Sequence, residues 1–380
     1  MRRRDVIGLL AGAAALPWPR PAGASQALLD ESVGFASEIL FLSLKVPALV
    51  LGVVRDGQTS IQGFGRRADN VSEAPVADTL FRIGSITKAF TGQVLASLAA
   101  DGVVSLADPL TKYCPEFIAP ISEGGRPIRL VDLATHSAGL PREVPHEAGP
   151  PDDPFVNITP NAFTAWLKAN PLMFTPGTAI SYSNFGFDLL AAALSRAAGQ
   201  PYPDLLDARV IRPLGLQDTS FAPSTGQAAR IMQGHNFDGS PMPNAKTGDV
   251  IVGSGGLYSS ARDLIAWLKW HLDRFSNEAA AERLIDHAAY LWRDGLNAVF
   301  GMDESGHMDA MSLAWVIMEP EGDRPLILQK AGGLQGVFSY VALAPARGIG
   351  VCAAINAFDL NAGLAIGKTA NDLIAELAPR

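Results

Sequence analysis

The chain has 380 residues, of which 48% are hydrophobic and 18% are charged, a composition that suits one large globular unit or two subdomains with a shared core. A net charge of −8 argues against nucleic acid as a partner. Two cysteines, Cys114 and Cys352, lie far apart in the sequence. They can pair only if the fold brings them together, and two separate buried thiols are the expected state.

The first 24 residues are typical of an export signal. Arg2-Arg3-Arg4 precedes an apolar run over 6–16, and Ala22-Gly23-Ala24 supplies the small residues of a cleavage site near Ala24. Paired arginines favour a twin-arginine signal over an ordinary secretory one. Either signal implies a periplasmic protein. The apolar run is too short to span a bilayer, and no later segment indicates a transmembrane helix in the mature chain.

The N-terminal half begins with a hairpin and continues mainly as helices. Apolar strands over 47–54 and 59–64 flank a turn at Asp56-Gly57. A buried helix is expected to begin at Ser85 and to end at Asp101-Gly102, because apolar residues recur at helical spacing. Six prolines predict an irregular loop over 141–160. Further helices are expected over 162–168, 188–198 and 202–210.

The C-terminal part predicts three strands between two helices. Ser260 favours the start of a helix that includes Trp267 and Trp270. The strands are expected over 325–330, 337–343 and 349–355, with breaks at Gly332-Gly333 and Arg347-Gly348, and a last helix over 362–377. This pattern predicts an α+β fold in which both ends of the chain form one antiparallel sheet. An α/β subdomain would comprise 25–84 and 250–380, and a mainly helical subdomain 85–249.

Ser85-Ile86-Thr87-Lys88 is the stretch most indicative of chemistry. Positions i and i+3 share a helix face, so the Lys88 amine can reach the Ser85 hydroxyl. Serine becomes a good nucleophile when an adjacent base takes its proton, and burial can make lysine that base. The helix N-terminus adds donor N–H groups where an oxyanion would form.

Two later motifs supply what this pair lacks. The Tyr182 phenol can carry a proton, and the Asn184 amide can bind a substrate carbonyl or Lys88. Lys330 precedes Gly332 and Gly333 at a strand end, where a ligand can approach the backbone. The Gly333 N–H could complete an oxyanion hole with that of Ser85. No cofactor is implied: no Cys/His cluster has zinc spacing, and Asp303, His307 and Asp309 indicate a polar loop more than a metal site.

The order Ser-x-x-Lys, Tyr-x-Asn, Lys-x-Gly resembles the penicillin-recognising serine hydrolases, in the branch of the class C β-lactamases. That resemblance implies a β-lactamase/transpeptidase-like fold, with a five-stranded-type antiparallel sheet flanked by helices and a helical subdomain. Within the branch the chain resembles the AmpH-type D-alanyl-D-alanine carboxypeptidase/endopeptidases. The stretches that carry this second resemblance are 134–142, Gly301-Met302-Asp303 with Ala314-Trp315-Val316, and 329–333.

The resemblance assigns roles and a substrate. Ser85 would be acylated by D-Ala-D-Ala peptides of peptidoglycan or by β-lactams, and Lys88 and Tyr182 would share the acid and base work. Asn184 would orient substrate, Lys330 would shape the local field, and Ser85 and Gly333 would donate backbone N–H groups. The stretch around His136 would give structural support.

One departure from the family concerns Ala331, which stands where a threonine or serine usually helps to bind the substrate carboxylate. Loss of such a charge-assisted hydrogen bond costs about 1.5–3 kcal/mol, roughly ten- to a hundredfold in binding. A class C-like β-lactamase and a β-lactamase-fold esterase are therefore alternatives to the D,D-peptidase. A third alternative is a non-catalytic protein that binds the cell wall.

Overall fold

The computed structural model describes residues 22–121, 125–248 and 250–378. Most of the predicted signal segment, residues 1–21, lies outside the described residues, and Ala22 begins helix α1 (Ala22–Leu44). Within the part of the chain that is described, no helix is long and apolar enough to cross a membrane.

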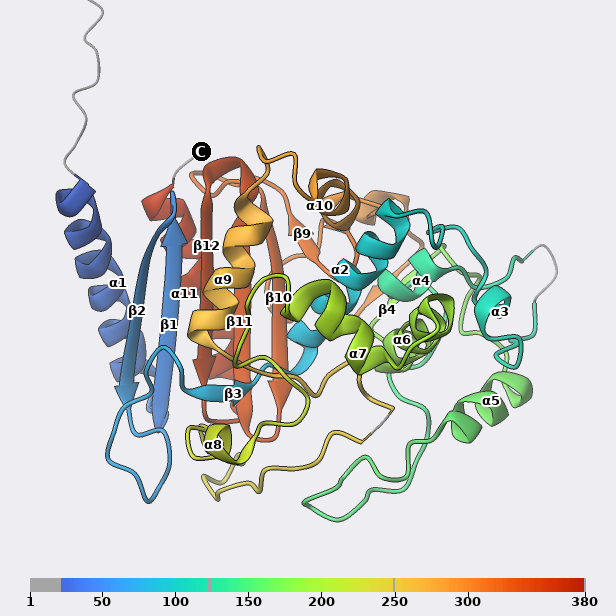
Figure 1. Cartoon of the computed structure of the whole chain (residues 1–380), viewed down its shortest axis with the longest axis horizontal. Helices are drawn as coiled ribbons and strands as arrows, with labels where there is room; N and C mark the ends of the chain where they lie inside the picture. Colours follow the sequence, from blue (N-terminus) through green and yellow to red (C-terminus); the bar gives the residue numbers. More distant parts are fainter. Residues whose placement is uncertain (1–21, 122–124, 249, 379–380) are drawn as a thin grey trace, which may run out of the picture.

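An antiparallel sheet forms the centre of the fold (Figure 1). It has eight strands in the order β2-β1-β12-β11-β10-β9-β8-β6. The five long strands come from both ends of the chain, so the predicted hairpin and C-terminal meander are confirmed as one sheet. Three short strands extend it. The bounds are β1 Ala48–Arg55, β2 Gln58–Gly65, β6 Leu291–Trp292, β8 Ala310–Met311, β9 Val316–Met318, β10 Ile327–Leu334, β11 Val337–Ala344 and β12 Ile349–Ile355.

The sheet is buried on both faces because helices cover both. In β1, Leu49 and Leu51 pack with α1 and the C-terminal helix α11 (Leu360–Leu377), whereas Val50 and Val54 belong to the core on the other face, which includes α9 (Ala261–Leu272). This alternation follows from the period of two along a strand. Consecutive apolar residues, as in the wholly buried β12, suit a strand with two covered faces.

The remaining elements lie beside this sheet or form the helical part of the molecule (Figure 1). The predicted helices are confirmed, and 141–159 contains no helix or strand. The bounds are β3 Leu80–Arg82, α2 Thr87–Ala100, α3 Leu110–Tyr113, α4 Leu130–Ala134, α5 Pro160–Ala169, β4 Ile180–Ser181, α6 Asn184–Ala198, α7 Tyr202–Leu206, α8 Thr225–Ala228, β5 Tyr258–Ser260, α10 Ala280–His287 and β7 Val299–Phe300. The division into two subdomains stays a prediction.

Three details qualify the sequence analysis. Strand β10 does not break at Gly332-Gly333 but runs on to Leu334, and the turn falls at Gln335-Gly336. The expected break was wrong because these glycines serve close backbone packing. Helix α1 was not predicted, since apolar residues occur on its buried and exposed sides alike, with Leu29 buried and Phe35 exposed. Cys114 and Cys352 are both free and buried, as expected.

Candidate active site

Ser85 lies where the chain passes from β3 into helix α2. Gly84–Ile86 form a 3-10 turn, and α2 follows directly. Gly84 has a φ of +49°, and a Cβ at this position would lie 2.7 Å from the Gly333 nitrogen. Glycine therefore permits both the unusual backbone and the close approach of β10. This contact brings the backbone around Gly333 next to Ser85 at the positive end of α2.

Lys88 extends from the first turn of α2 towards Ser85. Its side chain is buried, and Nζ donates hydrogen bonds to Ser85 Oγ at 3.0 Å and to the Ser254 carbonyl. Burial lowers the pKa of Lys88 to about 7; the charges of Asp188 and Glu143 oppose this shift, and Arg142 adds to it. A substantial fraction of the amine is therefore neutral at neutral pH, as a general base requires.

Tyr182 follows β4 and completes the contacts of the serine. Its hydroxyl donates to Ser85 Oγ at 2.5 Å. The His136 ring stacks on the phenol ring, with centroids 4.6 Å apart, and His136 Nδ1 accepts a hydrogen bond from the Ser183 N–H. Burial and the charges of Lys330 and Lys88 lower the pKa of His136 well below its usual value. A neutral His136 that positions Tyr182 agrees with the supporting role expected for its stretch.

Lys330 approaches the same phenol from β10. Its side chain is buried, and Nζ lies 5.3 Å from the Tyr182 ring centroid. Burial lowers the pKa of Lys330 to about 8; the charge of Lys88 adds to the shift, and Tyr182 and Glu304 oppose it. A Cβ on Gly332 would lie 2.0 Å from the Ile83 carbonyl, so glycine is needed for β10 to pack here.

Asn184 is the predicted residue whose placement differs most from expectation. Its amide nitrogen donates to Glu143 Oε1, and its Oδ1 is buried without a hydrogen-bond partner among the described residues. Among the described residues, Asn184 makes no hydrogen bond to Lys88. The structure thus gathers Ser85, Lys88, Tyr182, Lys330 and the glycines, but turns the Asn184 amide towards Glu143.

A cavity of about 190 Å³ opens beside the serine. Ser85 and Tyr182 lie on its wall, and Ala331 faces it from β10. The charged side chains on the wall are those of Arg142, Glu304 and Lys330. Carbonyl substrates in this cavity would meet a nucleophile, two proton carriers and positive charge.

Asp188 and Ser254 are functional candidates that sequence reasoning missed. The buried Asp188 carboxylate accepts hydrogen bonds from the Ser254 N–H at 3.0 Å and from the Ser254 hydroxyl at 3.1 Å. The Ser254 carbonyl in turn accepts from Lys88 Nζ. The available signal was an acidic residue inside the apolar run of α6, because a buried charge needs a partner.

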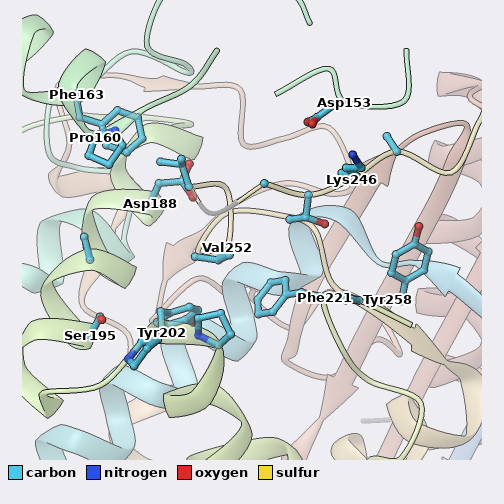
Figure 2. Close-up of a pocket in the computed structure, with 18 of the residues that line it drawn as sticks. Asp153, Pro160, Phe163, Asp188, Ser195, Tyr202, Phe221, Lys246, Val252 and Tyr258 are labelled. Carbon is cyan, nitrogen blue, oxygen red and sulfur yellow. The ribbon is translucent and has the colours of Figure 1, made fainter. Parts of the chain in front are cut away.

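A second, larger cavity of about 810 Å³ has Asp188 on its wall (Figure 2). Its walls include Asp188, Tyr202, Phe221 and Tyr258, but none of Ser85, Lys88 and Tyr182. The buried Tyr202 hydroxyl lies 2.7 Å from Thr91 Oγ1 of α2. The larger cavity is therefore not the one that contains the predicted catalytic residues, since Ser85 and Tyr182 line the smaller one.

The loop with Asp303, His307 and Asp309 has the polar character expected of it. His307 is largely exposed, and its ring nitrogens lie 3.7 Å from Asp303 and 3.5 Å from Asp309. Arg293 donates to both Asp303 oxygens, at 2.7 and 2.9 Å. A guanidinium already neutralises this carboxylate, which explains the arrangement without a metal ion.

The sheet, the helices and a serine contacted by lysine and tyrosine define a serine hydrolase with the β-lactamase fold. The Beta-lactamase family model matches residues 26–376, and the chain belongs to this family. It is 35% identical to the D-alanyl-D-alanine-carboxypeptidase/endopeptidase AmpH of Escherichia coli K12 over 355 residues, which cover 90% of each chain. It is 26% identical to a β-lactamase of Pseudomonas fluorescens, with 83% of this chain and 89% of that protein covered.

Solved structures agree with these sequence relationships. The β-lactamase/D-alanine carboxypeptidase of Yersinia pestis, solved with citrate, superposes with a TM-score of 0.81 at 36% identity, covering 92% of this chain and 99% of that one. A class C β-lactamase of Rhodobacter sphaeroides gives a TM-score of 0.75 at 25% identity, covering 91% and 99%. The expected fold class and the resemblance to this family are confirmed.

Proposed function

We propose that the protein is a serine D,D-carboxypeptidase/endopeptidase that acts on D-Ala-D-Ala peptides of peptidoglycan and is acylated by β-lactams. The observation that carries this proposal is the convergence of Lys88 Nζ and Tyr182 Oη on Ser85 Oγ. The similarity to the Escherichia coli carboxypeptidase/endopeptidase supports the substrate class.

Acylation begins with proton transfer from the serine. Ser85 loses its proton to Lys88 or Tyr182, each of which is hydrogen-bonded to Ser85 Oγ. The Oγ atom then attacks the penultimate D-Ala carbonyl. The backbone N–H groups of Ser85 and Gly333 stabilise the oxyanion. The C–N bond then breaks, the departing amine takes the proton, and an acyl-serine remains. Water later attacks the ester and regenerates Ser85.

Substrate recognition rests on positive charge. Lys330 and Arg142 border the cavity and attract the free carboxylate of a D-Ala-D-Ala peptide. Ala331 offers no hydroxyl at the usual position, so this attraction replaces a directed hydrogen bond. Asn184, held by Glu143, orients substrate once its amide is released or through its unpaired Oδ1.

The arginine-rich start of the chain supports export to the periplasm, with cleavage of the signal peptide near Ala24. Peptidoglycan peptides and β-lactams are available in that compartment. The alternative activity on the same site is that of a β-lactamase or an esterase, and the 26% identity to a β-lactamase supports it less.

Mass spectrometry of a reaction with a pentapeptide that ends in D-Ala-D-Ala tests the proposal. The purified mature protein should release D-alanine, and Ser85→Ala should release none. A wild-type protein that forms a penicillin adduct on Ser85 but releases no D-alanine from this peptide or from cross-linked peptides would overturn the D,D-peptidase assignment. That result would leave the β-lactamase and esterase activities.

A further inference from the structure

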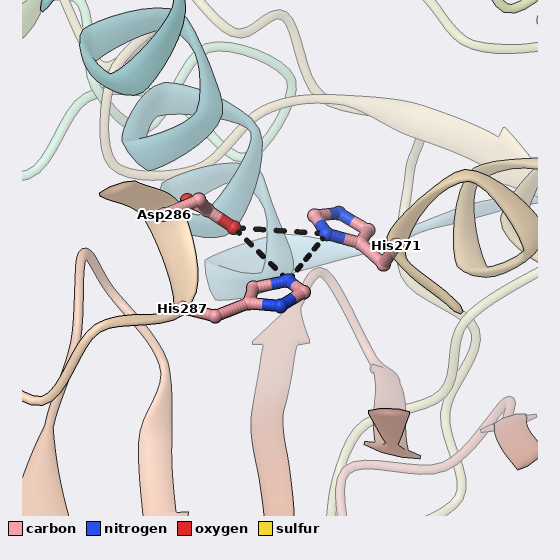
Figure 3. A group of neighbouring side chains, drawn as sticks. All are labelled: His271, Asp286 and His287. Carbon is pink, nitrogen blue, oxygen red and sulfur yellow. Dashed lines mark hydrogen bonds and ion pairs between the residues drawn. The ribbon is translucent and has the colours of Figure 1, made fainter. Parts of the chain in front are cut away.

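A second cluster of titratable side chains lies away from Ser85, where α9 and α10 approach each other. It consists of His271, Asp286 and His287 (Figure 3). His271 and Asp286 are completely buried, and the His287 side chain is 16% exposed. The proposed hydrolysis uses none of them.

One atom from each side chain lies at a corner of a small triangle, whose sides are the dashed lines of Figure 3. His271 Nδ1 lies 2.9 Å from His287 Nε2, and Asp286 Oδ2 lies 3.6 Å from each of these nitrogens. A triangle with these sides has a circumradius of about 2.0 Å, which matches the zinc–nitrogen and zinc–carboxylate bond lengths of about 2.0–2.1 Å. An ion at these bond lengths would lie close to the plane of the three atoms, and the two nitrogens would have to move apart by a few tenths of an ångström to give a tetrahedral site.

We propose that His271 Nδ1, His287 Nε2 and Asp286 Oδ2 bind one divalent metal ion, with Zn²⁺ the best match. Two imidazoles and one carboxylate are the donor types that zinc accepts in tetrahedral sites. A water molecule or the second oxygen of Asp286 supplies the fourth ligand.

His271 Nδ1 and His287 Nε2 form a hydrogen bond at 2.9 Å, but hydrogen bonds alone leave the carboxylate of this cluster poorly compensated. Asp286 Oδ2 accepts from the Trp315 indole N–H at 2.9 Å, yet it stays 3.6 Å from both imidazoles, beyond hydrogen-bond distance. Asp286 Oδ1 and His271 Nε2 are buried without partners among the described residues. Unpaired buried polar atoms are costly, and a cation would compensate the carboxylate directly.

An outer hydrogen bond of the cluster also suits a metal site. The Trp315 N–H orients Asp286 in the way that outer hydrogen bonds orient metal ligands.

The place of the site in the fold indicates a structural role. The ion would join the C-terminal ends of α9 and α10, and Trp315 links it to the segment before β9. Trp315 stacks on Trp267, and Trp267 stacks on Phe90 of α2 with centroids 4.2 Å apart. The metal would thus fasten the helices that support α2, which carries Lys88.

Metal content of the full mature chain, purified without a histidine tag, tests the inference. After chelator treatment and dialysis, titration with Zn²⁺ should show one tight equivalent per chain and should raise the Tm. Co²⁺ should give the visible absorption of a four-coordinate site. Asp286→Asn and His287→Gln should lose the tight equivalent, whereas His307→Ala, which alters the exposed polar loop, should keep it.

Two results would overturn the inference. One is wild-type protein that binds neither ion more tightly than micromolar and shows no rise in Tm. The other is a tight equivalent that survives in Asp286→Asn and His287→Gln but disappears in His307→Ala. The wild-type titration decides the question even where a variant fails to fold, and it is independent of hydrolytic activity.

Discussion

Two clusters of polar side chains, one at the start of helix α2 and one where α9 and α10 approach each other, differ in one decisive respect. Ser85, Lys88 and Tyr182 stand next to a cavity of about 190 Å³. His271, Asp286 and His287 are enclosed against Trp267 and Trp315. Both clusters contain groups whose pKa is shifted by burial.

A shifted pKa therefore does not by itself identify catalysis in this protein. The cluster around Ser85, which we propose to be catalytic, combines the shift with a hydroxyl that can act as a nucleophile and with room for a substrate. The enclosed cluster has ligand atoms but no nucleophile, which favours a contribution to stability. Substitutions in the two clusters should consequently separate activity from stability.

The largest effect is expected for Lys88→Met, which should lower kcat/KM for the pentapeptide by about 10⁴-fold by removing the base. The pKa of Lys88 is about 7 in the folded protein and 10.5 in the reference state. Between these values the unfolded chain binds more protons, so stability rises with pH and the buried amine costs stability at pH 7. Steady-state kinetics and thermal unfolding should show lost activity without a lower Tm.

Lys269→Met, at an exposed position of α9, is the matched control and should change neither kcat/KM nor the Tm.

Asp286→Asn should give the opposite pattern, with a lower Tm and nearly unchanged kcat/KM at a temperature where it is folded. If the Tm falls by many degrees in Lys88→Met while Asp286→Asn remains fully stable, the assignment of activity to the first cluster and of stability to the second is wrong.

Tyr182→Phe should have the next largest effect, a loss of about 10²-fold in kcat/KM. It removes one proton carrier from Ser85 Oγ but leaves the ring that stacks on His136. Fluorescent penicillin labelling of Ser85 should slow in parallel. Tyr113→Phe, which removes a hydroxyl hydrogen bond to Asp108, is the control. Equal rates for wild type and Tyr182→Phe would exclude the phenol from proton transfer.

Asp188→Asn should move the pH dependence of acylation and lower kcat/KM by about tenfold, since Ser254 loses one acceptor. Burial raises the pKa of Asp188 well above its usual value, but the charge of its ionised form raises the pKa of Lys88, so removal of the carboxyl group should lower the pKa of Lys88. Because the base must be unprotonated, the acid limb of the kcat/KM profile should shift to lower pH. Asp263→Asn removes another buried carboxylate, outside the recorded contacts of Lys88, and should leave the limb in place. An unmoved limb in Asp188→Asn would mean that Asp188 carries no charge there.

The sequence was sufficient for the parts of the fold and site that depend on local pattern. Apolar periodicity located α2 and the long strands, and the order of three short motifs singled out Ser85, Lys88, Tyr182 and Lys330, which the fold brings close together. The contact between Gly84 and Gly333 was not predictable as geometry, because it joins residues 249 positions apart through the sheet. For the same reason the glycines of β10 were misread as a break.

Long-range polar partners also escaped prediction. The link from Asp188 through Ser254 to Lys88 depends on how a loop and two helices pack, and no spacing in the sequence encodes it. His271 and Asp286 are fifteen positions apart and match no familiar ligand spacing, so their approach appears only in the folded chain. The glutamate that holds Asn184 follows Arg142 directly in an irregular loop, where periodicity gives no signal.

The smallest effect is expected at Ala331, and it tests how the cavity recognises a carboxylate. Ala331→Thr places a hydroxyl on the cavity wall, next to the positive charge of Lys330. We expect a three- to tenfold gain in kcat/KM for the D-Ala-D-Ala pentapeptide, less than a full charge-assisted hydrogen bond gives, because Lys330 and Arg142 already attract the carboxylate. An ester substrate without a free carboxylate is the control and should show no gain. If both substrates respond alike, position 331 acts through the shape of the cavity and not through recognition of the carboxylate.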